Sequence, residues 1–293
     1  MGWFALAPDG PATIEVVLAA TGSGETVGPV NRIDLGPEPV AVRIPWSLQS
    51  RPVPLDLIVR QAEGSINPAF IAVHYPLDRR PLVNLCRGKG VELGPGPRPQ
   101  IFPGEGVDVS YVEQTHPDDW GRLYGGSSEV NFDPALSDRY VVGNANDVPA
   151  EARSLDFIFS SHVFEHLANP LGHLEHWSGL LKSGGKIVAV IPDYIGSKDF
   201  LMEPTSIAEL ESEYASRNFD VTDAHYEAYG RARGDAKFGE ELRRKSLSIH
   251  VHFYTHDNTA AICEWAVRNL GYSSFSIIHA DNHKDFYLVL NKA

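Results

Sequence analysis

The sequence predicts an α/β protein with a buried, mostly parallel sheet, preceded by a small β-rich module. Residues 152–193 change from strand to helix to strand, because the apolar runs Leu155–Ser160 and Ile187–Ile191 flank a helical pattern that begins at Pro170. Two buried-type strands joined by a helix are typical of a parallel βαβ unit. Further upstream, Val91–Gly96 is a strand that runs into a glycine turn.

The helix of this unit has clear sequence signals. Proline is tolerated in a first helical turn, and apolar residues then recur at helical spacing, namely Leu171, Leu174, Trp177 and Leu180. We expect the helix to end at Gly184-Gly185, with Lys182 in its last turn.

Other apolar runs predict the rest of the sheet. The first five strands are expected over Gly90–Leu93, Gly106–Glu113, Arg139–Val142, Leu155–Ser160 and Lys186–Ile191. A helix near Asn258–Asn269 should end before Gly271. Two strands, Phe275–His279 and Phe286–Leu290, then form a hairpin around Asp281–Lys284, so the last strand is antiparallel.

The first eighty residues differ from the rest. Prolines and glycines separate strand-like runs, which are Thr13–Ala20, Ala41–Ile44, Leu55–Val59 and Phe70–His74. This pattern predicts an antiparallel accessory module over 1–80, joined by a linker at Pro76–Pro81 to a domain over 81–293. Oligomerisation or covering of the main domain is the favoured role. Exposed Trp3 and Trp46 would instead favour sugar binding.

Composition limits the partners. The 293 residues carry 25 Lys and Arg against 38 Asp and Glu, a net charge of −13, which disfavours a nucleic-acid partner. The two cysteines, Cys86 and Cys263, have no C-x-x-C spacing, as is usual in a reducing compartment. No apolar run reaches membrane-spanning length and the N-terminus lacks signal-peptide features, so we expect a cytoplasmic protein without membrane insertion.

Several motifs in order resemble one enzyme family. Glu92-x-Gly94-x-Gly96, Asp156-Phe157, Glu165-His166-Leu167 and Leu181–Gly185 resemble the class I S-adenosylmethionine-dependent methyltransferases. Tyr111–Glu113, Ile191–Asp193 and Ile249–His252 are similar to the bacterial branch associated with surface polysaccharide and glycan modification. The resemblance covers about residues 82–292. It implies a Rossmann-like sheet and S-adenosylmethionine as the cofactor.

The cofactor site is expected at the strand ends. Gly94 and Gly96, next to Glu92, let the backbone and its N–H groups approach a ligand. Glu113, 21 residues after Glu92, is placed to accept the ribose hydroxyls. The resemblance places Asn144 and Ala145 at the adenine, with Asp147 as the fallback, and includes Ser160 at the end of the fourth strand.

The segment after Gly96 argues against a nicotinamide site. Pro97-Arg98-Pro99 follows, so the third glycine of G-x-G-x-x-G is missing. Three prolines within 97–106 also exclude a regular helix there, so we expect an irregular crossover. Arg98 is either a surface residue or a charge for the methionine carboxylate.

The acceptor chemistry follows from the residues after the fourth strand. Ser160–Val163 lacks the [Asp/Asn]-Pro-Pro-[Tyr/Phe] of amide and exocyclic-amine methyltransferases, so O-methylation is favoured. A hydroxyl acceptor must lose a proton, which requires a base. His162 is a candidate base, with a structural role equally open. His166 contacts the acceptor or braces the next segment, and Asp193 could bind an acceptor hydroxyl.

His250 and His252 are the other catalytic candidates. They alternate, so they would share one side of an extended segment. Three interpretations compete: a base or acceptor contact, a structural pair, and metal ligation with His256 and Asp257. The first is favoured, and since no fixed metal signature is present we predict no metal site.

Residues Tyr194–Leu247 form an insertion that we expect to act as an acceptor-binding lid. Its first helix should span Ser206–Arg217, with Ser206 as N-cap and Glu209 completing a capping box. Tyr194, Asp199 and His225 are the expected acceptor contacts. The residues after the fourth strand favour an O-methyltransferase, and the resemblance to the glycan-associated branch implies a sugar or glycan acceptor. The alternatives are a small-molecule methyltransferase of natural-product biosynthesis and a non-catalytic cofactor-binding protein that assembles through its β-module.

Overall fold

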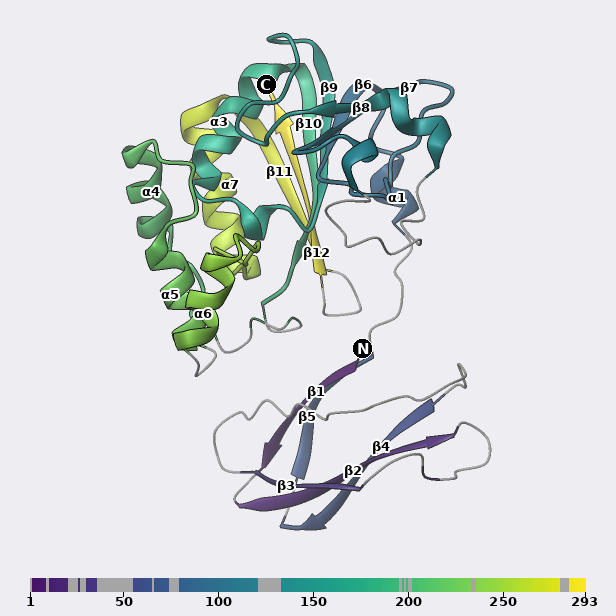
Figure 1. Cartoon of the computed structure of the whole chain (residues 1–293), viewed down its shortest axis with the longest axis vertical. Coiled ribbons are helices and arrows are strands. Elements are labelled where there is room, and N and C mark those ends of the chain that lie inside the picture. The colour runs from purple at the N-terminus through teal and green to yellow at the C-terminus, as the bar shows by residue number, and fades with distance from the viewer. Residues whose placement is uncertain are drawn as a thin grey trace. The chain divides into compact units, whose positions relative to one another are not determined.

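The computed structural model describes most of the chain (Figure 1). The described residues are 2–8, 11–20, 26, 30–35, 55–64, 66–73, 79–120, 133–194, 197, 199, 202–232, 236–279 and 285–293. The chain divides into two compact units, Met1–His74 and Tyr75–Ala293.

The first unit is made of antiparallel strands, as predicted. β1 (Gly2–Pro8) pairs with β5 (Ile66–Val73), while β2 (Ala12–Ala20) lies between β3 (Asn31–Leu35) and β4 (Leu55–Glu63). The sequence analysis missed β1 and β3. β3 alternates half-buried and exposed residues and buries only its last one, so its apolar signal is weak. The expected strand at Ala41–Ile44 lies outside the described residues.

The second unit is built on one sheet. Its described strands are β6 (Gly88–Leu93), β7 (Val107–Glu113), β8 (Tyr140–Val142), β9 (Leu155–Ser161), β10 (Leu181–Pro192), β11 (Tyr272–His279) and β12 (Asp285–Lys292). Their order is β11-β12-β10-β9-β6-β7-β8. β8, β7, β6, β9 and β10 are mutually parallel, and β12 is antiparallel to both neighbours, as predicted. The strand order reverses between β6 and β9, where open α/β sheets bind ligands.

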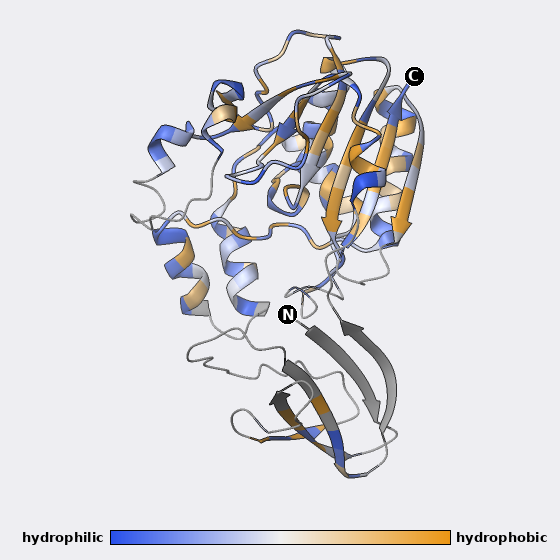
Figure 2. Cartoon of the chain, turned by 90° about the vertical axis from the view of Figure 1, so that its right-hand side faces the viewer, coloured by the Kyte–Doolittle hydropathy of each residue, from blue (hydrophilic) through white to orange (hydrophobic). Residues whose placement is uncertain are grey.

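Side chains alternate between two apolar layers along the central strands. Ile158 belongs to the layer that includes α3 (Pro170–Leu180) and α7 (His256–Leu270). Phe157 and Phe159 belong to the opposite layer, which includes α1 (Arg80–Val83). Figure 1 shows α3 and α7 on one side of the sheet and α1 on the other, and Figure 2 shows that the strands between them are largely hydrophobic.

The predicted end of the βαβ helix is wrong. α3 ends at Leu180, and Leu181, the first residue of β10, already pairs with Leu155 of β9. The helix stops because the N–H groups of Arg153 and Ser154 bind its last carbonyls. Lys182 therefore lies in the strand, where its Nζ is 2.8 Å from both carboxylate oxygens of Asp156.

The insertion contains three described helices: α4 (Ile207–Ser216), α5 (Asp223–Ala232) and α6 (Ala236–Arg244). The capping box of Ser206 and Glu209 is present, as predicted. Gly271 ends α7 with φ +71°, as predicted. The expected turn at Asp281–Lys284 lies outside the described residues. Within the described part of the chain, every helix is too short or too polar to cross a bilayer.

The contribution of the core to stability can be tested at Trp177 of α3. It is fully buried, stacks edge-on against Phe164 at 5.5 Å and donates a hydrogen bond to the Ala145 carbonyl. We expect Trp177→Ala to lower the free energy of unfolding by about 3–5 kcal/mol in denaturant titrations. Phe102→Ala, at a side chain that is 59% exposed, should cost less than about 0.5 kcal/mol. Equal losses in the two variants would contradict this account.

Candidate active site

The glycine turn after β6 has a left-handed backbone, but its predicted ligand-binding N–H groups are already bonded within the protein: Gly94 donates to the Val112 carbonyl at 3.0 Å and Gly96 to Glu113. Gly94 and Gly96 have φ of +61° and +56°, in the left-handed region that favours glycine. A Cβ added to Gly96 would meet no atom within 4 Å, so a ligand has room to approach that backbone. As predicted, the crossover 94–106, all of it described, contains no helix.

Glu92 determines the shape of this crossover. Its side chain is 1% exposed and accepts hydrogen bonds from the N–H groups of Gln100 (2.9 and 3.0 Å) and Ile101 (2.9 Å). Burial raises the pKa of Glu92 to about 7, although these bonds oppose the rise. The carboxylate predicted at the cofactor thus holds the loop around the cofactor site.

Glu113 lies against the glycine turn from the end of β7. Its Oε1 accepts the Gly96 N–H at 2.6 Å, while the Tyr140 hydroxyl donates to the Gly96 carbonyl at 2.7 Å. Burial raises the pKa of Glu113, and its backbone hydrogen bonds lower it. The structure therefore brings Gly96 and Glu113 together, as a shared cofactor site requires.

The segment predicted at the adenine is fixed by α3. Asn144 and Asp147 form an isolated bridge, and both are exposed. The Ala145 carbonyl accepts the Trp177 indole N–H at 2.6 Å, and His176 accepts the Val148 N–H at 3.1 Å. α3 thus positions this loop through two side chains that sequence analysis had assigned no role in the site.

His162 lies directly after β9, between two buried carboxylates. Its Nε2 is 3.0 Å from Oδ1 of Asp285 and its Nδ1 is 3.4 Å from Oε1 of Glu165. Burial lowers the pKa of His162, but the two carboxylates outweigh it and raise the pKa to about 9. At neutral pH both ring nitrogens of His162 are therefore protonated. The structure thus favours a hydrogen-bond donor over the predicted base. Ser160, also predicted here, is buried at the end of the same strand.

Arg79 extends this network. It donates to Gln100 (2.7 Å) and Ser161 (3.0 Å), and it lies 3.4 Å from Asp285. Sequence analysis missed Arg79 and Asp285, because one falls in the expected linker and the other opens the last strand. No local pattern links them across 206 residues.

His250 and His252 separate rather than share one side. Residues 247–255 are not a strand, and the two rings reach different carboxylates. Nδ1 of His250 is 2.5 Å from Oδ2 of Asp199, and Nε2 of His252 is 3.0 Å from Oε2 of Glu213. The expectation of one shared face is therefore corrected.

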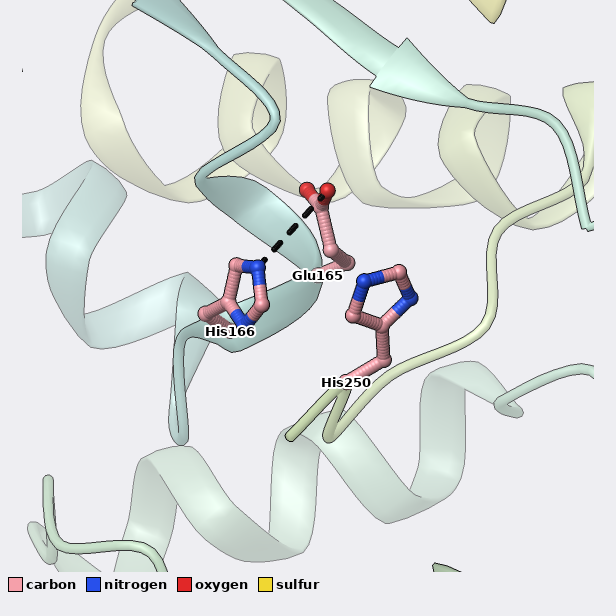
Figure 3. Close-up of side chains that lie close together, drawn as sticks. All are labelled: Glu165, His166 and His250. Atoms are coloured by element: carbon pink, nitrogen blue, oxygen red, sulfur yellow. Dashed lines mark ion pairs between the residues drawn. The ribbon is translucent and has the colours of Figure 1, made fainter. Parts of the chain in front are cut away.

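Glu165, His166 and His250 lie close together (Figure 3). Nδ1 of His166 is 2.8 Å from the Ile249 carbonyl and 2.9 Å from the Ser248 hydroxyl, so His166 also braces the segment that carries His250. Asp193 is buried at the end of β10.

The remaining lid residues lie in two other places. Tyr194 packs against an apolar cluster that includes Met202, Tyr229 and Phe253. His225 accepts the Thr222 N–H at 3.0 Å and lies 3.4 Å from Glu213. Its surroundings form a separate hollow, lined by residues including Ala168, Glu213, Asn218 and His225.

Residues 125–189 match a family model described as a methyltransferase domain. The match contains β8, β9, α3 and most of β10, together with His162 and Glu165. This match indicates that the protein is a methyltransferase. Its cofactor is S-adenosylmethionine. The space beside Gly96, with Glu113 next to it, leaves room for such a ligand.

Several solved structures to which the chain is similar are described as methyltransferases. One from Aquifex aeolicus is S-adenosylmethionine-dependent, with 13% identity, coverage of 72% of this chain and 86% of that chain, and a TM-score of 0.40. One from Thermotoga maritima, described as a candidate histamine N-methyltransferase, has 14% identity, 72% and 86% coverage and a TM-score of 0.37. An O-methyltransferase candidate from Nostoc punctiforme has 13% identity, 72% and 54% coverage and a TM-score of 0.41. No curated protein matches. Likeness this low carries no argument about the acceptor.

Gly96→Ala tests the glycine turn. The added methyl group meets no protein atom, but it enters the space assigned to the cofactor. We expect S-adenosylmethionine binding, measured by calorimetry, to weaken at least tenfold. Gly106→Ala is the matched control, because Gly106 has φ +73°, has no atom within 4 Å of an added Cβ, and precedes β7 at the other edge of the sheet. Both should lose about 1 kcal/mol of stability from the left-handed backbone. Equal cofactor affinity in the two variants would exclude this placement.

Glu213 gives a pH-dependent prediction. Burial raises its pKa, but the hydrogen bonds of His225 and His252 outweigh this and lower it to about 2. The carboxylate therefore stabilises the fold above its unfolded-state pKa, and this stabilisation is lost as the pH falls from about 4.5 to about 2. Glu213→Gln should lower the unfolding free energy by roughly 2 kcal/mol at pH 7 and by only a few tenths of a kcal/mol near pH 2. The exposed Glu211→Gln is the control; a loss for Glu213→Gln that is constant with pH would contradict the assignment.

Proposed function

We propose that this methyltransferase transfers a methyl group to a hydroxyl group of a sugar or glycan. The observation that carries the proposal is the polar, charged environment directly after β9. There His162 lies between Asp285 and Glu165, and the segment lacks the Pro-Pro-aromatic sequence of amide methyltransferases. A polyhydroxyl acceptor suits such a group of donors and acceptors.

We assign the cofactor contacts as follows. S-adenosylmethionine supplies an electrophilic methyl group on a cationic sulfur. Gly94 and Gly96 leave room for its close approach, and Glu113 can accept a ribose hydroxyl while it holds Gly96. Asn144, Ala145 and Asp147 border the adenine, with Ser160 behind the methyl group; Glu92 supports all of them by fixing the crossover.

On the acceptor side, His162 donates a hydrogen bond and Asp193 accepts one. His166, Asp199 and His250 complete this side, and the insertion 194–247, with Tyr194 and His225, acts as a lid. The contact of His252 with Glu213 favours a bracing role. Residues 1–80 serve as an accessory module suited to homo-oligomer assembly, and the cytoplasm is the expected location.

The proposal is tested by a methylation assay. The full-length protein is incubated with S-adenosylmethionine and a panel of free sugars, nucleotide sugars and oligosaccharides. We expect mass spectrometry to show one added methyl ether on a sugar. His162→Ala should lower turnover by roughly 10²-fold, His162→Gln should restore part of it through its amide donor, and His256→Ala should match the wild type. Methylation of amines alone would reject the sugar acceptor. Cofactor binding without transfer to any acceptor would favour a non-catalytic protein.

A further inference from the structure

Glu165, His166 and His250 form a cluster with metal-ligand character. Each offers one ligand atom, and these atoms lie within 4.8 Å of one another; no other group of three or more such side chains is found in the described part of the chain. Glu165 and His166 come from the 3₁₀ turn η3 (Phe164–His166), and His250 comes from the segment before α7 (Figure 3). The N–H groups of Val251 and His252 bind the Glu165 carbonyl, at 2.6 and 3.3 Å, which holds the two segments together.

The Glu165 carboxylate is buried without a good hydrogen-bond donor. It is 1% exposed, and among the described residues neither oxygen has a hydrogen-bond partner. Imidazole nitrogens of His162 and His166 lie 3.4 and 4.0 Å from its Oε1, beyond good hydrogen-bond distance. A buried carboxylate is costly unless a cation or donors satisfy it. We infer that the unsatisfied carboxylate oxygens of Glu165 bind a cation.

Both imidazoles are held in the orientation that metal ligation requires. A carbonyl oxygen only accepts, so the 2.8 Å contact with Ile249 places a proton on Nδ1 of His166, and in the neutral ring Nε2 carries the lone pair. In His250, the Asp199 carboxylate, 2.5 Å from Nδ1, likewise accepts a hydrogen bond from that nitrogen and leaves the lone pair on Nε2. The Ser197 hydroxyl donates a hydrogen bond to Asp199 at 3.1 Å. Backbone carbonyls and carboxylates are the usual outer partners of metal-bound histidines.

We propose that Glu165, His166 and His250 bind one divalent transition-metal ion, with zinc as the best match. Two imidazoles and one carboxylate suit zinc, iron(II), cobalt or nickel, whereas Ca²⁺ and Mg²⁺ prefer oxygen ligands. Ligand atoms around zinc lie about 3.3 Å apart when the bonds are roughly 2 Å, so the three side chains draw together on binding. This assignment revises the prediction that the chain has no metal site.

Three protein ligands leave one coordination position open, as in catalytic zinc sites. This step rests on the proposed function. An acceptor hydroxyl in that position would lose its proton to water more readily, because a metal ion lowers the pKa of bound oxygen. Asp199 is a positioning residue in this site, because it acts through His250.

Metal binding is measured without any acceptor. The full-length protein, freed of metal by a chelator, is titrated with ZnCl₂ by calorimetry and with CoCl₂ by visible absorption. We expect one ion per chain in the wild type, at least tenfold weaker binding in Glu165→Gln, His166→Ala and His250→Ala, and wild-type binding in the control His256→Ala. Asp199→Asn should bind roughly 10- to 100-fold more weakly while it keeps the cobalt absorption bands, because all three ligands remain.

The proposal is overturned if the wild type binds zinc no more tightly than the His166→Ala/His250→Ala double variant, with both folded by circular dichroism. If a ligand variant fails to fold, Asp199→Asn decides, since unchanged zinc affinity there also overturns the site. S-adenosylmethionine titrations on the same samples separate the two proposals. Cofactor binding without metal binding rejects only the metal site, and metal binding without sugar methylation rejects only the acceptor.

Discussion

The buried carboxylate of Glu92 is the constraint on which the carboxyl edge of the sheet depends. The crossover after β6 contains four prolines, which remove donors and prevent a helix, so its remaining N–H groups need another acceptor. Glu92 supplies that acceptor for Gln100 and Ile101. In return, the space beside Gly96 is left open, where a normal first crossover would begin a helix. The turn to which we assign the cofactor is thus shaped by the Glu92 side chain.

A continuous series of polar contacts leads from this crossover to the acceptor side. The Gln100 side chain accepts from Arg79, Arg79 lies against Asp285, and Asp285 faces His162, which in turn faces Glu165. Cationic and anionic groups alternate along the series, so most of the buried charge is compensated within it. Glu165 is the last member and has the poorest hydrogen bonding. A metal ion at Glu165 would complete the alternation.

Elements whose signals are local were predicted well. The capping box at Ser206, the glycine that ends α7 and the irregular crossover each depend on residues a few positions apart. The end of α3 was misplaced because the N–H groups that stop it come from Arg153 and Ser154, which precede β9. β3 was missed because it buries too little apolar surface to leave a pattern.

The sequence by itself determined the βαβ units, the glycine turn and the placement of Glu113 beside it, because strand periodicity and turn chemistry are written within short segments. Only the tertiary structure decided the charge of His162, the separation of His250 from His252, and the meeting of Glu165 with His166 and His250. The reason is physical. A pKa and a ligand set depend on burial and on partners such as Asp285, Asp199 and Ile249, which folding brings together from distant positions.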